Sequence, residues 1–451
     1  MTDLPKEFIE RISRQLGNEL PDFLRAMNEK PVRGIRMNLQ KPFAGMDIYT
    51  KMEHIPWAED GFFLPAESTA GATVFHEAGA FYLQEPSAMI PAAVLKPNPG
   101  ERILDMCAAP GGKSTQIGSM MNGEGILICN EPVPKRAQIL SRNIERMGIA
   151  NSIVTCMFPE KMPVSWNGMF DGILVDAPCS GEGMFRRDPQ TRTEWTAAMT
   201  SGCVKRQRNI LKEAARMVRP GGRLVYSTCT YNPEENEETV KWFLNNFPDF
   251  HTESFHLEGV EGNDGMFLCL PNRIKGEGQF TALMRKKGSD SSGRLSFPFI
   301  KPDRKDINLL RDTIPGIPEP NAVFRNKLII APECPDLNGV QILRAGLQIA
   351  EIRGNNVFPD HASAMCILRG KIQNVSMDNE NTARYIAGEE ITGNGNGWLL
   401  LKYKGLVLGW GKCSNGMIKN HYPKGLRKNG IMTETETEIH TVGETGRLKV
   451  N

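Results

Sequence analysis

The stretch that decides the fold is Ile103-Leu104-Asp105-Met106-Cys107-Ala108-Ala109-Pro110-Gly111-Gly112-Lys113-Ser114-Thr115. An apolar run that ends at Asp105 is followed by a turn of small residues and then by a predicted helix over 113–121. This order predicts strand, tight turn and helix. In an open parallel sheet such a turn lies at the carboxyl end of its strand, where glycines let the backbone approach a ligand closely. The sequence therefore predicts an α/β fold with a ligand site at this turn.

A second apolar run, 126–130, ends at Glu131. A carboxylate about 20 residues beyond a glycine-rich turn is placed to accept hydrogen bonds from ribose hydroxyls. We therefore expect the pocket at the turn to hold a cofactor that contains a nucleoside.

A nucleotide hydrolase is the competing interpretation of this stretch. Gly112-Lys113-Ser114 resembles the end of a phosphate-binding loop, and 173–176 resembles the acidic strand that often accompanies it. That loop needs a glycine five residues before Gly112, where this chain has Cys107. Pro110 also removes a backbone N–H from a loop that would have to donate N–H groups to phosphate. The hydrolase is therefore the weaker alternative.

Three segments, in this order, resemble the motifs of S-adenosylmethionine-dependent RNA cytosine-5 methyltransferases: 105–115, Asp-Ala-Pro-Cys-Ser-Gly at 176–181, and Ser-Thr-Cys-Thr at 227–230. The added carboxyl-terminal region resembles the RsmF group of this family, which acts on small-subunit (16S) ribosomal RNA. The resemblance implies a Rossmann-like class I methyltransferase domain with a mostly parallel seven-stranded sheet and helices on both faces. It also implies S-adenosyl-L-methionine as the cofactor and RNA as the partner.

The length of 451 residues predicts two to four domains. Composition at 286–293 is typical of a linker. With the resemblance, this predicts a small N-terminal α+β RNA-binding domain (1–75), the catalytic domain (76–287), a linker (288–305), a small α+β domain (306–375), a PUA-like β RNA-binding domain (376–432) and a polar tail (433–451).

Charge and cysteine usage bound the class of protein. The formal net charge is +2, from 54 basic and 52 acidic residues, so any RNA surface must come from local segregation of charge. Ten cysteines and seven histidines include no Cys-x-x-Cys pair, and no metal is expected. The amino terminus lacks a signal-peptide pattern and no apolar run is long enough to span a bilayer. We expect a cytoplasmic monomer with free thiols and no membrane partner.

Two cysteines suit the chemistry of this reaction. Carbon 5 of cytosine is a poor nucleophile until a thiolate adds to carbon 6, and an acid near ring nitrogen 3 then stabilises the ring. Cys179 and Cys229 each end a predicted strand at one sheet edge, and Asp176 is placed to be the acid. Chemistry alone leaves open which cysteine attacks. The family's pattern assigns attack to Cys229 and product release to Cys179.

The cofactor is expected to contact the turn and the ends of the neighbouring strands. The predicted contacts are Cys107, Ala108, Ala109, Pro110, Gly111, Gly112, Lys113, Glu131, Arg136 and Asp176. For Arg136 the alternative is a solvated side chain. Lys113 contacts either the cofactor or the target base, or lies in solvent. Phe158 departs from the family, which often has an adenine-contacting aspartate there, and either stacking on Phe158 or a contact from Glu160 replaces it.

Basic residues near predicted loops and in 398–428 are the candidate RNA contacts. The segment 33–38 resembles the Arg-x-Asn segment of the family's N-terminal domain, and arginines beside the loop after Gly181 suit phosphate anchoring. From 398 to 428 seven basic residues occur with five aromatic ones and no acidic residue, which suits irregular RNA, although the aromatics could equally form a β-barrel core. The predicted contacts are Arg33, Arg36, Arg186, Arg187, Lys402, Lys404, Lys412 and Lys424.

The sequence thus predicts an RNA cytosine-5 methyltransferase that flips its target base into the gap between the cofactor and the cysteines. The alternative from a different class is a catalytically silent, RNA-binding ribosome assembly factor that keeps the fold. Retention of Cys179, Cys229 and Asp176 speaks against this alternative.

Overall fold

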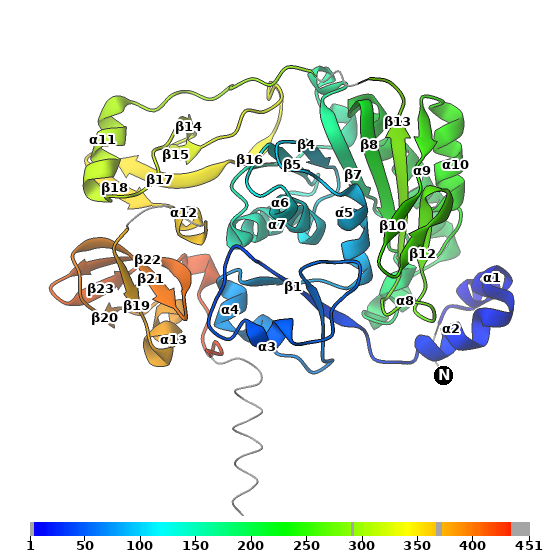
Figure 1. Ribbon diagram of the computed structural model, residues 1–451, viewed down its shortest axis with the longest axis horizontal. Helices are drawn as coiled ribbons and strands as arrows, with labels where there is room; N and C mark the ends of the chain where they lie inside the picture. Colours follow the sequence, from blue (N-terminus) through cyan, green and yellow to red (C-terminus); the bar gives the residue numbers. More distant parts are fainter. Residues whose placement is uncertain (1–3, 290–292, 367–371, 434–451) are drawn as a thin grey trace, which may run out of the picture.

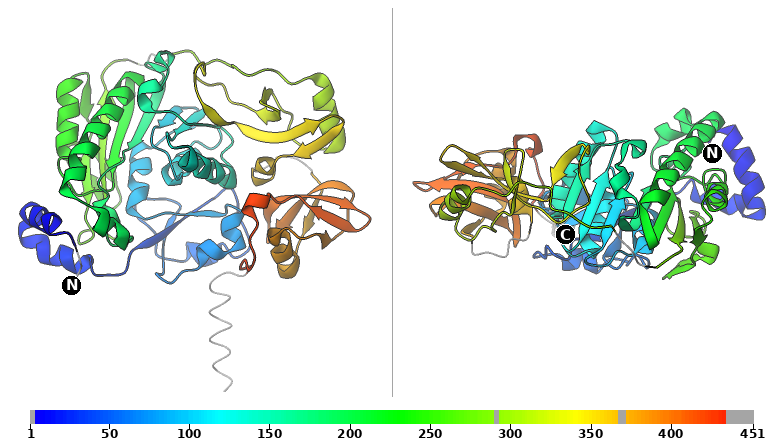
Figure 2. Two further views of the ribbon diagram at one scale, coloured as in Figure 1. Left: turned by 180° about the vertical axis from the view of Figure 1, so that it is seen from behind. Right: turned by 90° about the horizontal axis from the view of Figure 1, so that it is seen from above.

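The computed structural model describes residues 4–289, 293–366 and 372–433. Part of the predicted linker (290–292) and all of the tail but its first residue lie outside these ranges. The catalytic sheet occupies the middle of the molecule, with the first two helices at one side and the C-terminal sheets at the other (Figure 1). The view from above in Figure 2 shows the same order along the long axis.

The central sheet has nine strands. Strands β4 to β8 run parallel, and β12, β13, β9 and β16 pair antiparallel at its two sides. The order is β12 (Met266–Cys269), β13 (Gln279–Lys286), β8 (Val218–Thr228), β7 (Phe170–Asp176), β4 (Arg102–Asp105), β5 (Ile126–Asn130), β6 (Ser152–Thr155) and β16 (Ile342–Ala345), with β9 (Phe250–Thr252) beside β13. The predicted mostly parallel sheet, finished by an antiparallel pair, is confirmed. Strands β9 and β16 extend it beyond seven.

Helices cover both faces of this sheet, as predicted. Neighbouring strand residues point to opposite faces, so Ile103 and Leu127 pack in one buried cluster while Leu104 and Ile128 pack in another. The first cluster is completed by α5 (Ile90–Leu95), α6 (Gly112–Met120) and α7 (Pro134–Met147), the second by α9 (Ala197–Met217) and α10 (Glu237–Asn246). The near-continuous apolar strands are therefore buried on both sides.

The N-terminal region forms a sheet and a separate pair of helices. The sheet has the order β2 (Gly61–Leu64), β1 (Arg33–Met37), β3 (Phe81–Leu83), and α3 (Asp47–Thr50) and α4 (Val74–Glu77) accompany it. Because β3 pairs with β1, this domain continues past the predicted boundary at residue 75. Helices α1 (Lys6–Leu16) and α2 (Leu20–Ala26) instead pack on the catalytic domain, where the Phe8 and Phe185 ring centroids are 5.1 Å apart.

The region after 293 is divided differently from the prediction. Strand β16 pairs with β6, with Ile342 opposite Thr155, and Cys334 and Leu337 belong to the catalytic core. The segment expected to be a linker pairs Ser296 with Cys334. Residues 306–375 are therefore not self-contained: they supply the strand that covers the edge of β6. Composition does not reveal such a distant pairing.

The C-terminal region adds two smaller sheets. The first consists of β14 (Ala322–Phe324), β15 (Lys327–Ile330), β17 (Leu347–Arg353) and β18 (Asn356–Pro359), with α11 (Arg304–Thr313) and α12 (His361–Met365). The second has the order β19 (Asn374–Ser376), β21 (Gly397–Tyr403), β22 (Leu406–Ser414), β23 (Met417–Asn420) and β20 (Ile391–Thr392), with α13 (Asn379–Ala387). The remaining elements are α8 (Pro189–Glu194), β10 (Phe255–Leu257) and β11 (Val260–Gly262). The second sheet shares a buried cluster with the N-terminal sheet, so the ends of the chain are packed together.

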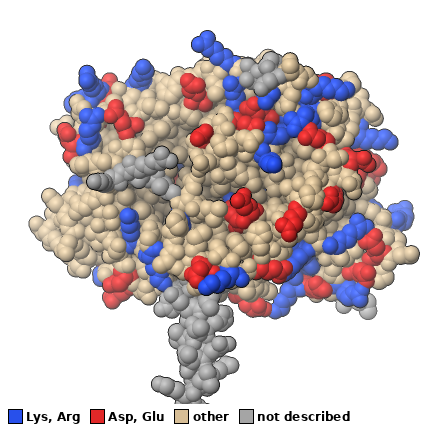
Figure 3. All heavy atoms as spheres, in the orientation of Figure 1, with Lys and Arg blue, Asp and Glu red and all other residues tan. Residues whose placement is uncertain are grey.

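Two global features bear on function. Among the described residues, no helix has the length and apolarity needed to cross a membrane, and no three His, Cys, Asp or Glu side chains gather in a group that could hold a metal ion. On the face shown in Figure 3, basic and acidic side chains are interspersed. Any site for a charged ligand must therefore be local.

Candidate active site

Two adjoining cavities open at the carboxyl ends of β4, β5, β7 and β8. One has a volume of about 580 Å³ and reaches Glu131, and the other, of about 260 Å³, reaches toward β13. Both are lined by Cys107, Ala109, Asp176 and Cys229. The predicted site residues from three separate motifs thus meet at the wall between two spaces.

The glycine-rich turn is held in place from both sides. Gly111 has φ +115°, and a Cβ there would lie 3.3 Å from side-chain atoms of Leu140 and Asn143, so glycine is required. The Ala108 N–H donates to the Asn130 carbonyl at 2.9 Å, which ties the turn to β5. The turn therefore presents its backbone to the larger cavity in one fixed shape.

Glu131 and Arg136 lie together in the larger cavity, as the prediction of a shared ligand requires. The Glu131 carboxylate is buried and accepts a hydrogen bond from the Val133 N–H at 2.9 Å. Arg136 pairs with its other oxygen at 3.1 Å and donates to the Ala109 carbonyl at 3.0 Å. Arg136, although about half exposed, thus joins the end of β5 to the glycine-rich turn.

The two cysteines converge. Their Sγ atoms are 3.3 Å apart, and the Cys229 N–H donates to the Cys179 sulfur at the same distance. The hydrogen bond with Cys229, together with burial, holds the pKa of Cys179 well above its ordinary value. Cys179 is therefore a thiol at neutral pH, with its proton available to the Cys229 sulfur.

Asp176 accepts three hydrogen bonds beside these thiols. Lys113 Nζ lies 2.8 Å from Oδ2, while Ser227 Oγ and Gln279 Nε2 lie 2.7 and 3.3 Å from Oδ1. Burial would lower the pKa of Lys113, but the charge of Asp176 raises it above its ordinary value. The alternative that Lys113 lies in solvent is wrong, because its side chain is only 13% exposed.

Two buried glutamates behind the cysteines were not among the predicted site residues. Glu235 accepts from the Ser180 hydroxyl at 2.5 Å and from Gln207 at 2.7 Å, and Glu182 accepts from the Tyr231 N–H at 3.1 Å. Burial raises the pKa of both carboxyls. These contacts connect the loop that carries Cys179 with the loop that carries Cys229. The sequence offered only the closeness of the glutamates to the two motifs as a signal.

Asp105, at the end of β4, is a further unpredicted member of the site. It is fully buried, lines the smaller cavity and accepts from the Ser114 hydroxyl at 2.7 Å. Its Oδ1 atom has no hydrogen-bond partner in the described part of the chain. Burial raises the pKa of this carboxyl to about 7.

The expectation that Arg36 and Arg186 contact RNA is corrected by their burial. Arg36 is fully buried and donates to Thr115 Oγ1 at 2.7 Å, and Arg186 pairs with Glu277 at 2.7 Å. Both guanidinium groups hold the N-terminal region against the catalytic domain. Arg187, in contrast, is exposed at the smaller cavity.

The other predicted RNA contacts differ in how far they are exposed. Arg33 donates to the carbonyls of Ala66 and Ser68 at 2.9 and 2.7 Å. Lys402 and Lys404 are half-buried, and Lys412 and Lys424 are exposed. Four of the five aromatic residues among them are buried in the last sheet, as the β-barrel alternative required: Trp398, Tyr403, Trp410 and Tyr422.

Three stretches of the chain match known protein families. Residues 4–86 match the N-terminal domain of 16S rRNA methyltransferase RsmF, and residues 92–285 match the 16S rRNA methyltransferase RsmB/F family. Residues 373–428 match the methyltransferase RsmF PUA domain. The expected order of a methyltransferase domain between an N-terminal domain and a PUA domain is confirmed.

Similar proteins extend the match over nearly the whole chain. Ribosomal RNA small subunit methyltransferase F of Vibrio vulnificus is 32% identical, with 94% of this chain and 97% of that protein covered. The protein of the same name from Shewanella loihica is 30% identical, with 97% and 98% covered.

Solved structures share the fold over 63% of the chain. A methyltransferase homolog from Pyrococcus horikoshii has a TM-score of 0.55 at 29% identity, with 96% of that chain covered. NSun6 from the same organism, solved with SFG, has a TM-score of 0.55 at 23% identity, with 99% covered. The predicted enzyme class, an RNA methyltransferase, is confirmed by the relatives. The chain therefore belongs to the RsmF family of 16S ribosomal RNA methyltransferases.

Proposed function

We propose that the enzyme transfers a methyl group from S-adenosyl-L-methionine to carbon 5 of a cytosine in small-subunit ribosomal RNA. Catalysis proceeds through a covalent bond between Cys229 and carbon 6 of the base. The observation that carries this proposal is the meeting of two thiols and Asp176 at the wall shared by two cavities. Since one chain supplies all these groups, we also propose that the enzyme acts as a cytoplasmic monomer.

The larger cavity suits the cofactor. Its buried carboxylate, Glu131, is placed for ribose hydroxyls, and its wall includes two apolar side chains, Val133 and Phe158, that are 44% and 57% exposed. A planar adenine between them would cover this apolar surface, so stacking takes the place of the aspartate that Phe158 replaces. S-adenosylmethionine bound there supplies an electrophilic methyl group beside the thiols.

The smaller cavity suits the target base. Asp176 faces it from the Lys113 side, and exposed Arg187 at its rim is available to a phosphate of the flipped nucleotide. When a thiolate adds to carbon 6, the displaced electron pair makes ring nitrogen 3 basic. The proton that Asp176 shares with Lys113 then passes to nitrogen 3, which neutralises the ring while carbon 5 acts as the nucleophile.

The cysteines take different roles because their environments differ. Cys229, as the thiolate, forms the bond to carbon 6, while Cys179 keeps its proton. Once the Cys229 sulfur is bonded to carbon, it no longer raises the pKa of Cys179 through their hydrogen bond. Cys179 can then take the proton from carbon 5 as a thiolate, and the electron pair of the carbon–sulfur bond returns to Cys229. The methylated base is released.

Cysteine variants test this assignment. Cys229→Ala is expected to abolish methyl transfer from labelled S-adenosylmethionine to RNA, and Cys179→Ala to accumulate a covalent protein–RNA adduct that migrates slowly in a denaturing gel. Cys203→Ala is the matched control, because this buried cysteine lies on α9 and lines neither cavity. Adducts in Cys229→Ala, with none in Cys179→Ala, would reverse the two roles.

The substrate assignment has its own test. Bisulfite sequencing of ribosomal RNA from a strain that lacks the gene should show the loss of 5-methylcytosine at one or more small-subunit positions. Restoring the wild-type gene should restore the signal, and a gene that encodes Cys229→Ala should not. Unchanged methylation in the deletion strain would refute small-subunit RNA as the substrate.

A further inference from the structure

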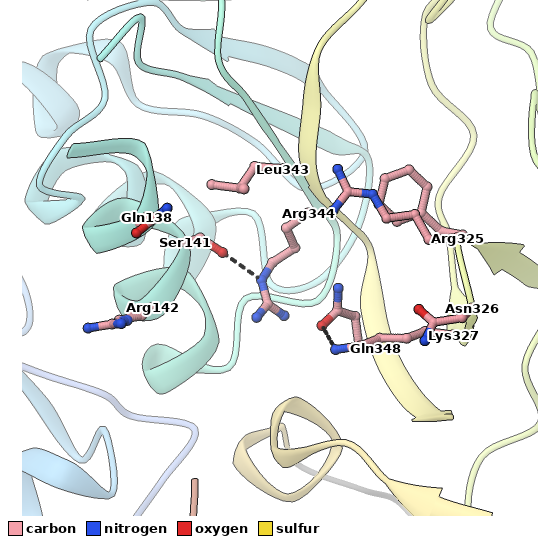
Figure 4. Close-up of a pocket in the computed structure, with 10 residues that line it drawn as sticks. Gln138, Ser141, Arg142, Arg325, Asn326, Lys327, Leu343, Arg344 and Gln348 are labelled. Carbon is pink, nitrogen blue, oxygen red and sulfur yellow. Dashed lines mark hydrogen bonds between the residues drawn. The ribbon is translucent and has the colours of Figure 1, made fainter. Parts of the chain in front are cut away.

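A second cleft, of about 330 Å³, lies between helix α7 of the catalytic domain and strands β15 to β17 of the C-terminal region (Figure 4). Four of the ten residues that line it are basic, namely Arg142, Arg325, Lys327 and Arg344, and none is acidic. Because the net charge of the chain is only +2 and Figure 3 shows mixed charge, a cleft with one sign of charge is a local exception.

The positive charge of the cleft is only partly neutralised. Arg344 pairs with Glu145, and Lys327 pairs with Asp360. Arg142 and Arg325 are both exposed, and neither has a carboxylate partner within the described ranges. The cleft therefore presents two uncompensated guanidinium groups, which attract an anion.

The cleft is built from fixed parts. Arg344 is only 9% exposed and its Nε donates to Ser141 Oγ at 3.1 Å, which joins β16 to α7 (Figure 4). Arg325 lies 5.1 Å from the ring centroid of Phe324 and donates to the Ile342 carbonyl at 2.9 Å. A ligand would meet a preformed fork of donors rather than a mobile side chain.

The cleft lies beside the active site. Helix α7 begins at Pro134, and its first turn carries Arg136 in the cofactor cavity. Arg142 follows six residues later, about 9 Å along the helix axis. On the opposite wall, Ile342 pairs with Thr155, whose carbonyl accepts the N–H of Glu131 at 3.1 Å. A chain that leaves the active site along α7 would therefore cross this cleft.

We propose that this cleft binds the sugar–phosphate backbone of the substrate RNA at a distance from the target cytosine. Arg142 and Arg325 pair with phosphates, while the exposed amide of Gln138 at the same cleft contacts a ribose hydroxyl. The inference rests on the proposed function, because it takes RNA bound for methylation as the ligand. It assigns the junction of the catalytic and C-terminal regions a role in holding that RNA.

The test compares two double variants in the full-length enzyme. Arg142→Ala with Arg325→Ala removes the uncompensated charges of the cleft. Arg304→Ala with Lys305→Ala, the matched control, removes two exposed charges from α11, which lies outside the cleft. Affinity for transcribed 16S ribosomal RNA is measured by filter binding at several salt concentrations, and S-adenosylmethionine affinity is measured in parallel.

The cleft variant is expected to bind RNA about tenfold more weakly at low salt. The slope of log affinity against log salt should fall by about 2, because each of the two arginines no longer neutralises a phosphate. The control should keep the wild-type slope, and cofactor affinity should be the same in all three proteins. Equal decreases in the two variants, or no decrease in either, would overturn the proposal.

Two further arms separate the possible outcomes. Inorganic phosphate is titrated by calorimetry, and phosphate binding that depends on Arg142 and Arg325, without any change in RNA affinity, would make this a small-anion site and overturn the RNA assignment. Methyl transfer by the wild type is followed on the same RNA. If it forms 5-methylcytosine while the cleft variant binds RNA normally, only the cleft proposal fails. If it forms none while the variant binds weakly, only the cytosine-5 proposal fails.

Discussion

Helix α7 contributes to two sites of opposite character. Its first turn belongs to the cofactor cavity, where Glu131, Asp176 and the thiols are short side chains held by other protein groups. Further along, Arg142 faces the cleft to the C-terminal region from an exposed position. The comparison teaches that bond formation is assigned to short groups held by the fold. Attraction of RNA is assigned to long cationic side chains, whose contacts tolerate small displacements.

The largest effect should come from Asp176→Asn. The amide cannot pass the shared proton to the base, so single-turnover methyl transfer should slow by about 10²- to 10⁴-fold. RNA affinity and its salt dependence should not change. A tenfold decrease in RNA affinity would break the comparison, because the same residue would then serve both attraction and chemistry.

The next effect concerns stability and pH. The pKa of Asp105 is about 7 in the folded protein against an ordinary value of 3.8, so between these values the folded state holds a proton that the unfolded state releases. Asp105 therefore lowers stability progressively as pH rises from about 4 to 7, by about 4 kcal/mol in total. Asp105→Asn should show a melting temperature that gains on the wild type over this range. A constant difference between the two proteins would show that Asp105 does not titrate there.

Sequence reasoning succeeded where residues adjacent in the chain determine the geometry. The turn at 105–115, Glu131 and the two cysteines follow separate strands, and parallel strands bring their carboxyl ends to one edge. It failed for Arg36 and Arg186, because the sequence does not show that a basic residue has a distant buried partner such as Glu277. The pairing of β16 with β6 was missed for the same reason.

A smaller effect should come from Phe158→Ala. Loss of stacking on the adenine should weaken S-adenosylmethionine binding about tenfold, as is typical when an aromatic platform is removed. Calorimetry measures this affinity directly. Val164→Ala is the control, because Val164 is highly exposed nearby but lines neither cavity of the active site. The comparison is sharpened if RNA affinity is unchanged in both variants.

The smallest effect should come from the last domain. Lys412 and Lys424 are exposed, and each is expected to contribute about one unit to the salt slope of RNA binding. Lys412→Ala with Lys424→Ala should reduce affinity severalfold in filter binding. Methyl transfer at saturating RNA should be unaffected. A lower rate at saturation would show that this domain also positions the target, which the comparison assigns to the catalytic domain.

The long separation between β6 and β16 has a consequence for how the protein is made. β6 ends at Thr155, and the strand that pairs with its outer edge begins only at Ile342. On the translating ribosome, the nascent catalytic sheet therefore waits with unpaired backbone N–H and C=O groups until much of the remaining chain has emerged. An open edge of this kind invites pairing with other chains, so premature termination within this interval should yield an aggregation-prone product rather than a smaller working enzyme.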